Sequence, residues 1–102
     1  KYLLFTGNTL SAQEMKTYGF VNEVVADENL QEAAQALALH IAAKSPIALR
    51  RMKSVANAAA DKTRDDALLH EMYEFRKHQR SWDMQEGLAA FAEKRKPEFQ
   101  GR

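Results

Sequence analysis

The stretch of residues 81–97 constrains the fold most, because it carries a complete set of start and stop signals for one short helix. Ser81 can accept a backbone N–H bond at the start of the helix, and Asp83 and Glu86 suit its positive first turn. Three cations at 94–96 suit the negative last turn, and a proline then stops the helix. We therefore predict a helix that begins after Ser81 and ends just before this proline.

The apolar face of this predicted helix ends in a positive charge. Met84, Leu88 and Phe91 follow one another at helical spacing, and Lys94 continues the same face. An aromatic ring beside an ammonium group suits a purine ring with a phosphate next to it. An apolar stripe that ends in lysine is also typical of any surface helix packed on a core, and spacing alone favours that second interpretation.

Capping signals also divide the first part of the chain. Ser11 and Glu14 form a capping box, and the helix that they begin should end at Gly19. The apolar run at 1–6 is either a strand or the last turn of a helix. The β-branched run at 20–25 is predicted to be a short extended segment.

Three longer helices are predicted next. The first, over 30–41, is capped by Asp27 or Asn29. The second begins with Ser45 as its N-cap and a proline at its first position. The third runs over 64–80 and has an apolar band wider than one packing partner needs. The stripe predicted to be buried on the second of these helices consists of Ala48, Met52, Val55 and Ala59.

The composition favours a small helical protein and argues against several classes of function. At 102 residues the chain allows one modest core, since a domain of this size hides only roughly 60 to 65% of its unfolded surface. Alanine is abundant while glycine and proline number 4 and 2, which favours helices. A net charge of +1 gives no support for nucleic-acid or membrane binding, and no apolar run is long enough to span a bilayer. The absence of cysteine fits a reducing compartment, which we expect to be the cytoplasm, and the three histidines lack metal-ligand spacing.

Three blocks of sequence resemble the enoyl-CoA hydratase/isomerase (crotonase) superfamily. They occur in the order found in that family and span nearly the whole chain, which makes the match more specific than any single block. The blocks are Leu4–Gly7 with Ser11, Ala12, Glu14 and Gly19–Val25; Ala43–Leu49 with Lys53; and Gln85–Gly87 with Ala90, Phe91, Glu93–Pro97 and Phe99.

The resemblance implies a mainly α fold. The chain would be the C-terminal helical domain of the crotonase fold, which serves for trimerisation and as a lid, with a short extended segment near residues 20–25. Residues 1–26 would be the tail end of the crotonase core, and residues 27–102 the C-terminal helical domain. Because a family motif begins almost at the first residue, which is not methionine, we expect that the N-terminus of the full protein is missing.

The resemblance also implies that the catalytic groups lie elsewhere. In this family, backbone N–H groups hold the thioester oxygen in an oxyanion hole, and hydratases add a pair of glutamates. All of these belong to the N-terminal core, before the point where this chain begins, so no catalytic residue is assigned here. We expect the chain to be inactive alone and the parent protein to hydrate 2-enoyl-CoA, with isomerase and thioester hydrolase activities as alternatives.

By motif position, three residues match family positions near the substrate. Phe91 and Lys94 match an aromatic residue and a lysine near the adenine and 3′-phosphate of coenzyme A, and Phe75 matches a bulky residue near the acyl pocket. Coenzyme A would be part of the acyl-CoA substrate, with no separate cofactor and no metal. The resemblance further implies a homo-oligomer, either a trimer or a dimer of trimers. The alternative is a helical association module without a ligand role, and for Phe75 plain packing is the favoured interpretation.

Overall fold

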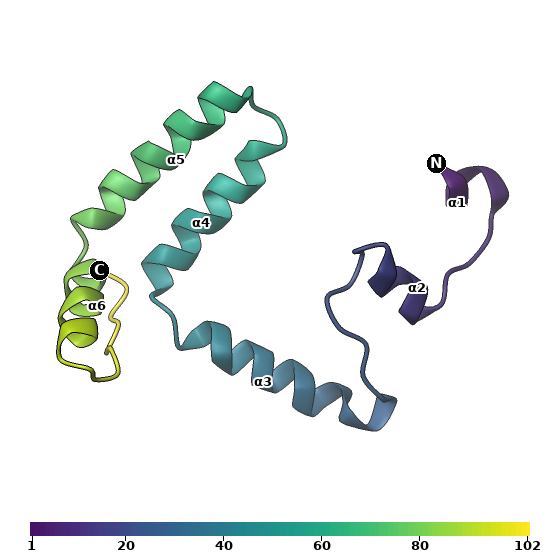
Figure 1. Cartoon of the computed structure of the whole chain (residues 1–102), viewed down its shortest axis with the longest axis horizontal. Coiled ribbons are helices and arrows are strands. Elements are labelled where there is room, and N and C mark those ends of the chain that lie inside the picture. Colours follow the sequence, from purple (N-terminus) through teal and green to yellow (C-terminus); the bar gives the residue numbers. More distant parts are fainter. The chain divides into compact units, whose positions relative to one another are not determined.

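The computed structural model describes all 102 residues and contains helices but no β-strand (Figure 1). The helices are α1 (Tyr2–Thr6), α2 (Ala12–Thr17), a 3-10 turn (Asp27–Asn29), α3 (Leu30–Ala42), α4 (Pro46–Ala59), α5 (Arg64–Gln79) and α6 (Trp82–Ala92). This confirms the mainly α fold predicted from the sequence. The chain divides within α3 into two compact units, residues 1–37 and 38–102, and each is described by itself.

The first unit begins with a single helical turn, so the open choice at residues 1–6 is settled in favour of helix. α1 ends where Gly7 adopts a left-handed conformation with φ 67°, and the Gly7 N–H donates to the carbonyl of Leu3 at 2.9 Å. A glycine is suited to this position because a side chain would be strained there.

The capping box of α2 is confirmed. The Ser11 hydroxyl accepts from the Glu14 N–H at 3.2 Å, while the Glu14 carboxylate accepts from the Ser11 N–H at 2.8 Å. The predicted left-handed glycine also closes this helix, since Gly19 has φ 78° and its N–H donates to Lys16. Hydrogen bonds at both its start and its end thus fix the bounds of α2.

The cap predicted for α3 is not the one observed. Residues 20–26 lie in neither helix nor strand, and a 3-10 turn then leads directly into α3. The position before this turn is Ala26, which has no side-chain oxygen, so neither Asp27 nor Asn29 acts as the cap. Asp27 lies instead in the first turn, where its charge faces the positive helix end.

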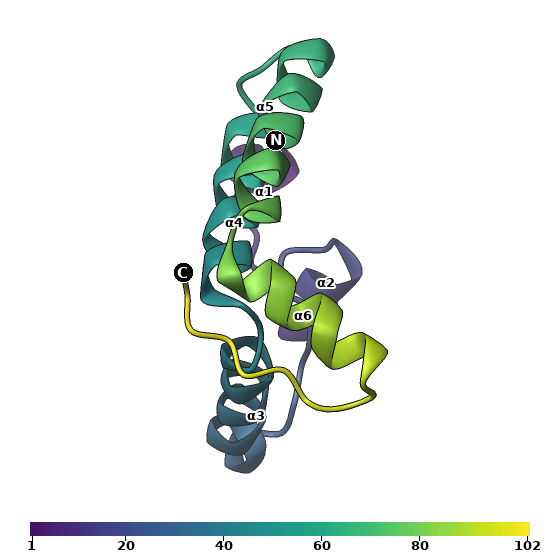
Figure 2. The same ribbon diagram turned by 90° about the vertical axis from the view of Figure 1, so that its left-hand side faces the viewer.

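The second unit is built around an antiparallel pair, α4 and α5, which lie side by side (Figure 1). Ser45 caps α4 by accepting from Ala48 N–H at 3.2 Å, as predicted, and Thr63 caps α5. An ion pair at 2.8 Å joins Arg51 on α4 to Glu74 on α5. α6 follows α5 after a short turn, and the C-terminal tail runs back along α6 (Figure 2).

The chain buries almost no apolar side chain of its own. Ala90 is its one buried hydrophobic residue, whereas Met52 in the stripe predicted to be buried is 58% exposed and Ala59 is also exposed. The prediction for these two residues was wrong because a single pair of helices covers only one side of each, and a second layer is needed to bury the rest. None of the helices has the length and apolar character needed to cross a bilayer.

Candidate functional site

The predicted N-cap of α6 is confirmed. The buried Ser81 hydroxyl accepts from the Met84 N–H at 3.2 Å and donates to the carbonyl of His78 at 2.6 Å. One hydroxyl therefore ends α5 and begins α6, which fixes the direction in which α6 leaves the pair of helices.

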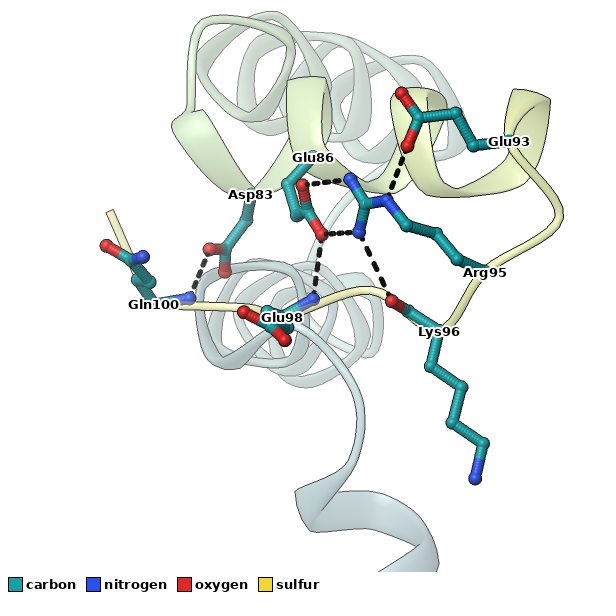
Figure 3. A network of polar contacts seen from close by, with 7 residues as sticks. All are labelled: Asp83, Glu86, Glu93, Arg95, Lys96, Glu98 and Gln100. Atoms are coloured by element: carbon teal, nitrogen blue, oxygen red, sulfur yellow. Dashed lines mark hydrogen bonds and ion pairs between the residues drawn. The ribbon is translucent and has the colours of Figure 1, made fainter.

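Asp83 is the most buried polar residue of the chain, with 1% of its surface exposed. Its carboxylate accepts from the hydroxyl of Ser45 at 2.6 Å and from the N–H groups of Gln100 at 2.8 Å and Gly101 at 3.0 Å. Its own N–H donates to the carbonyl of Arg102 at 3.0 Å. One side chain thus joins the start of α4, the start of α6 and the C-terminal tail. Figure 3 shows its contact with Gln100 of the tail.

These contacts also decide the charge state of Asp83. Burial acts to raise the pKa of the carboxyl group, but the hydrogen bonds from Ser45, Gln100 and Gly101 outweigh it and lower the pKa below its ordinary value. The sequence assigned Asp83 to the first helical turn and did not predict this role. Its partners lie 17 to 38 positions away in the chain, so no local spacing could have indicated them.

The end of α6 differs from the prediction. The last turn was expected to include residues 94–96, yet α6 stops at Ala92, and Lys94 adopts a left-handed conformation with φ 54°. The Arg95 N–H donates to the Ala90 carbonyl at 3.0 Å, and the Lys94 N–H donates to Phe91 at 3.3 Å. This pair of bonds is the Schellman motif, which satisfies free carbonyls in the last turn of a helix. The helix therefore ends several residues before the proline.

The Arg95 guanidinium then folds back onto α6. It donates to both carboxylate oxygens of Glu86 at 2.6 and 2.9 Å, to Glu93 at 2.6 Å, and to the carbonyl of Lys96 at 3.2 Å (Figure 3). Glu86 also accepts from the Glu98 N–H at 2.8 Å. Hydrogen bonds from Arg95 and from this N–H lower the pKa of Glu86 to about 2, and the pairing raises the pKa of Arg95.

The structure brings two of the three candidate residues together. Phe91, which is 86% exposed, and Lys94 lie within the same turn at the end of α6. The ion pairs at this end of the helix belong to Arg95, and the exposed Lys94 ammonium has none. We call Phe91 and Lys94 the α6 tip.

Phe75 lies elsewhere, on α5, and is 52% exposed. It lines a groove of about 420 Å³ between α4 and α5, together with Met52, Val55 and Arg51. Neither residue of the α6 tip lines this groove. The Nε atom of Arg51 is buried there without a hydrogen-bond partner, while its Nη1 atom pairs with Glu74.

Solved structures contain helices similar to those of this chain. An enoyl-CoA hydratase from Bacillus anthracis matches with a TM-score of 0.96 at 37% identity, covering 100% of this chain and 40% of that one. A structure from Geobacillus kaustophilus, described as enoyl-CoA hydratase subunit I, matches with a TM-score of 0.91 at 41% identity, covering 97% of this chain and 38% of that one. The helices are therefore those of an enoyl-CoA hydratase fold.

Sequence comparison defines the family. The chain is 39% identical over 100 residues to the 1,2-epoxyphenylacetyl-CoA isomerase of Escherichia coli, covering 98% of this chain and 38% of the relative. It is 38% identical to a probable enoyl-CoA hydratase of Mycobacterium leprae, covering 98% of this chain and 39% of the relative. The model of the enoyl-CoA hydratase/isomerase family matches residues 1–102, and the chain belongs to this family. It spans about two fifths of the length of these relatives.

Proposed function

We propose that this chain is the C-terminal helical part of a protein that acts on acyl-CoA thioesters, with hydration of a 2-enoyl-CoA as its reaction. The names of the Escherichia coli and Mycobacterium leprae relatives support the substrate class, since each name includes an acyl-CoA thioester. An isomerase among them keeps isomerisation as the alternative reaction. Within such a protein the α6 tip contributes the rim of the CoA site.

The observation that carries the proposal is the composition of the α6 tip. An aromatic ring that is 86% exposed lies one helical turn from a lysine without an ion-pair partner, at the end of α6. Stacking on an aromatic face suits adenine, and an unpaired ammonium suits the 3′-phosphate of coenzyme A. By motif position, Phe75 in the α4–α5 groove would lie near the acyl group.

The test is a binding measurement on the full-length protein that carries this chain. Lys94→Gly removes the ammonium but keeps the left-handed backbone, because glycine adopts positive φ at little cost. We expect affinity for coenzyme A to fall by about three- to fivefold, the upper part of the range for one exposed charged contact. Lys96→Gly is the matched control, because Lys96 is a neighbouring exposed lysine outside the tip.

Dephospho-coenzyme A sharpens the result, since it differs from coenzyme A only in lacking the 3′-phosphate. The unmodified protein should bind it more weakly than coenzyme A, whereas the Lys94→Gly variant should bind both equally. An unchanged preference for coenzyme A in the variant would refute the contact between Lys94 and the phosphate.

A second role, subunit association, is favoured by the open apolar faces of α4 and α5. Large side chains remain more than half exposed on these helices, among them Met52, Leu69 and Phe75. Apolar surface of this kind is usually covered in the working protein. We propose that it packs within a trimer or a dimer of trimers, which analytical ultracentrifugation of the full-length protein would detect. Monomers at micromolar concentration would contradict this role.

A further inference from the structure

The backbone of Lys94 is the one exception in the chain to a general rule. Among the residues other than glycine, it alone has a positive φ, at 54°. For a residue with a Cβ atom this conformation is disfavoured by about five- to thirtyfold in population. Glycine serves at the equivalent positions after α1 and α2, so the same chain closes two other helices without this cost.

Contacts of the Lys94 side chain do not explain the exception, because that side chain is exposed and forms no ion pair. What holds the turn lies on both sides of it. Arg95 donates to Glu86 through two nitrogens at 2.6 and 2.9 Å, and Glu98 donates its N–H to the same carboxylate at 2.8 Å. Two residues that follow Lys94 are thus tied to one side chain of α6, which precedes it.

This carboxylate is well placed to act as an anchor. The Glu86 side chain is 9% exposed, unlike Glu93, whose side chain is 60% exposed although it also contacts Arg95 at 2.6 Å. Competing water weakens a bidentate ion pair with a largely buried carboxylate far less than it weakens a single exposed contact. Glu86 therefore carries the constraint, and Glu93 adds little.

We propose that Glu86 and Arg95 are positioning residues, which hold Lys94 in its left-handed conformation and thereby aim its ammonium at the 3′-phosphate of coenzyme A. The inference rests on the proposed contact between Lys94 and that phosphate. Backbone strain persists where surrounding structure over-determines it, and it is concentrated at sites that bind or react. Glycine has the lowest free-energy cost at this position, but it would form the turn without supplying a charge. A lysine here is therefore what such a site would need.

The first measurement is spectroscopic and uses the full-length protein that carries this chain, with lysine labelled selectively. Positive φ at Lys94 gives a strong intraresidue contact between the amide and α protons in NMR spectra. Glu86→Gln keeps the size of the side chain but removes its charge, and we expect it to lower the left-handed population of Lys94 severalfold. Glu93→Gln is the matched control and should leave the signal unchanged. An unaltered signal in Glu86→Gln would overturn the inference.

The second measurement is a double-mutant cycle of CoA affinity in the full-length protein. Glu86→Gln should weaken binding of coenzyme A by about threefold, within the range for one charged contact, and should leave the affinity for dephospho-coenzyme A unchanged. In the Lys94→Gly background, Glu86→Gln should have no further effect. A merely structural role would instead weaken both ligands in both backgrounds, and that result would overturn the inference.

The two proposals fail in different ways. If Lys94→Gly leaves CoA affinity unchanged, the proposed phosphate contact is wrong. If Lys94→Gly weakens binding while Glu86→Gln does not, the contact stands and the positioning role is wrong. Should Glu86→Gln fail to fold, Arg95→Lys replaces it, because it keeps the charge and loses the bidentate geometry. Full affinity in that variant would likewise overturn the positioning role.

Discussion

At the scale of single residues, Asp83 links segments that the chain itself keeps apart. Removing its carboxylate would leave the Ser45 hydroxyl and two backbone N–H groups of the tail without their buried acceptor. Unsatisfied buried donors cost far more than the net gain from each bond when it is formed. Asp83 is therefore the residue whose loss should affect this unit most.

We predict that Asp83→Ala lowers the free energy of unfolding by roughly 3 kcal/mol, the cost of leaving two or three donors unpaired. Asp83→Asn should lose less, because the amide oxygen still accepts from the tail N–H groups. Asp61→Ala is the control, since Asp61 is exposed. Urea unfolding of the full-length protein measures all three, and equal stability of Asp83→Ala and Asp61→Ala would show that the buried contacts contribute nothing.

At the scale of elements, the beginnings of the helices followed from the sequence more closely than their packing did. The caps at Ser11, Ser45 and Ser81 were predicted because a cap and its partner lie three residues apart. The end of α6 was missed because a left-handed lysine closes it where glycine is the usual signal, and because the Arg95–Glu86 pair beside it spans nine positions. Local chemistry is readable from the sequence, whereas closure by a distant side chain is not.

The tail after α6 should be released by acid. The pKa of Glu86 is lowered to about 2 from 4.5, so this group stabilises the attached tail fully above pH 4.5. Its contribution is lost as the pH falls from 4.5 through 2, and the lowered pKa of Asp83 acts in the same direction. We expect the protection factors of amide protons in the tail, such as that of Glu98, to fall over this range once exchange rates are corrected for the intrinsic effect of pH. In Glu86→Gln the remaining change should be smaller, and an unaltered profile would contradict the assignment.

At the scale of the whole molecule, the apolar stripes located the helices but not which faces are covered. Met52, Leu88 and Phe91 were all expected on apolar faces, and all remain largely exposed in this chain. Periodicity identifies a face of a helix, while burial depends on what lies opposite that face. Membership of the family follows from the sequence, because it depends on motifs at short range. The candidate site was predicted only in part, since the α6 tip is formed by neighbouring residues and the groove at Phe75 by two helices.

The share of its relatives that this chain spans also leads to a prediction about activity. The chain spans 38 to 39% of the two relatives. From the family resemblance we expect the oxyanion hole and the catalytic glutamates to lie outside it. We therefore predict that the 102-residue chain does not hydrate crotonyl-CoA, measured as loss of the ultraviolet absorbance of the enoyl thioester. A complete enoyl-CoA hydratase of the family serves as the positive control. Turnover that co-purifies with the chain would show that these helices carry catalytic groups of their own, because a contaminating hydratase would separate from them.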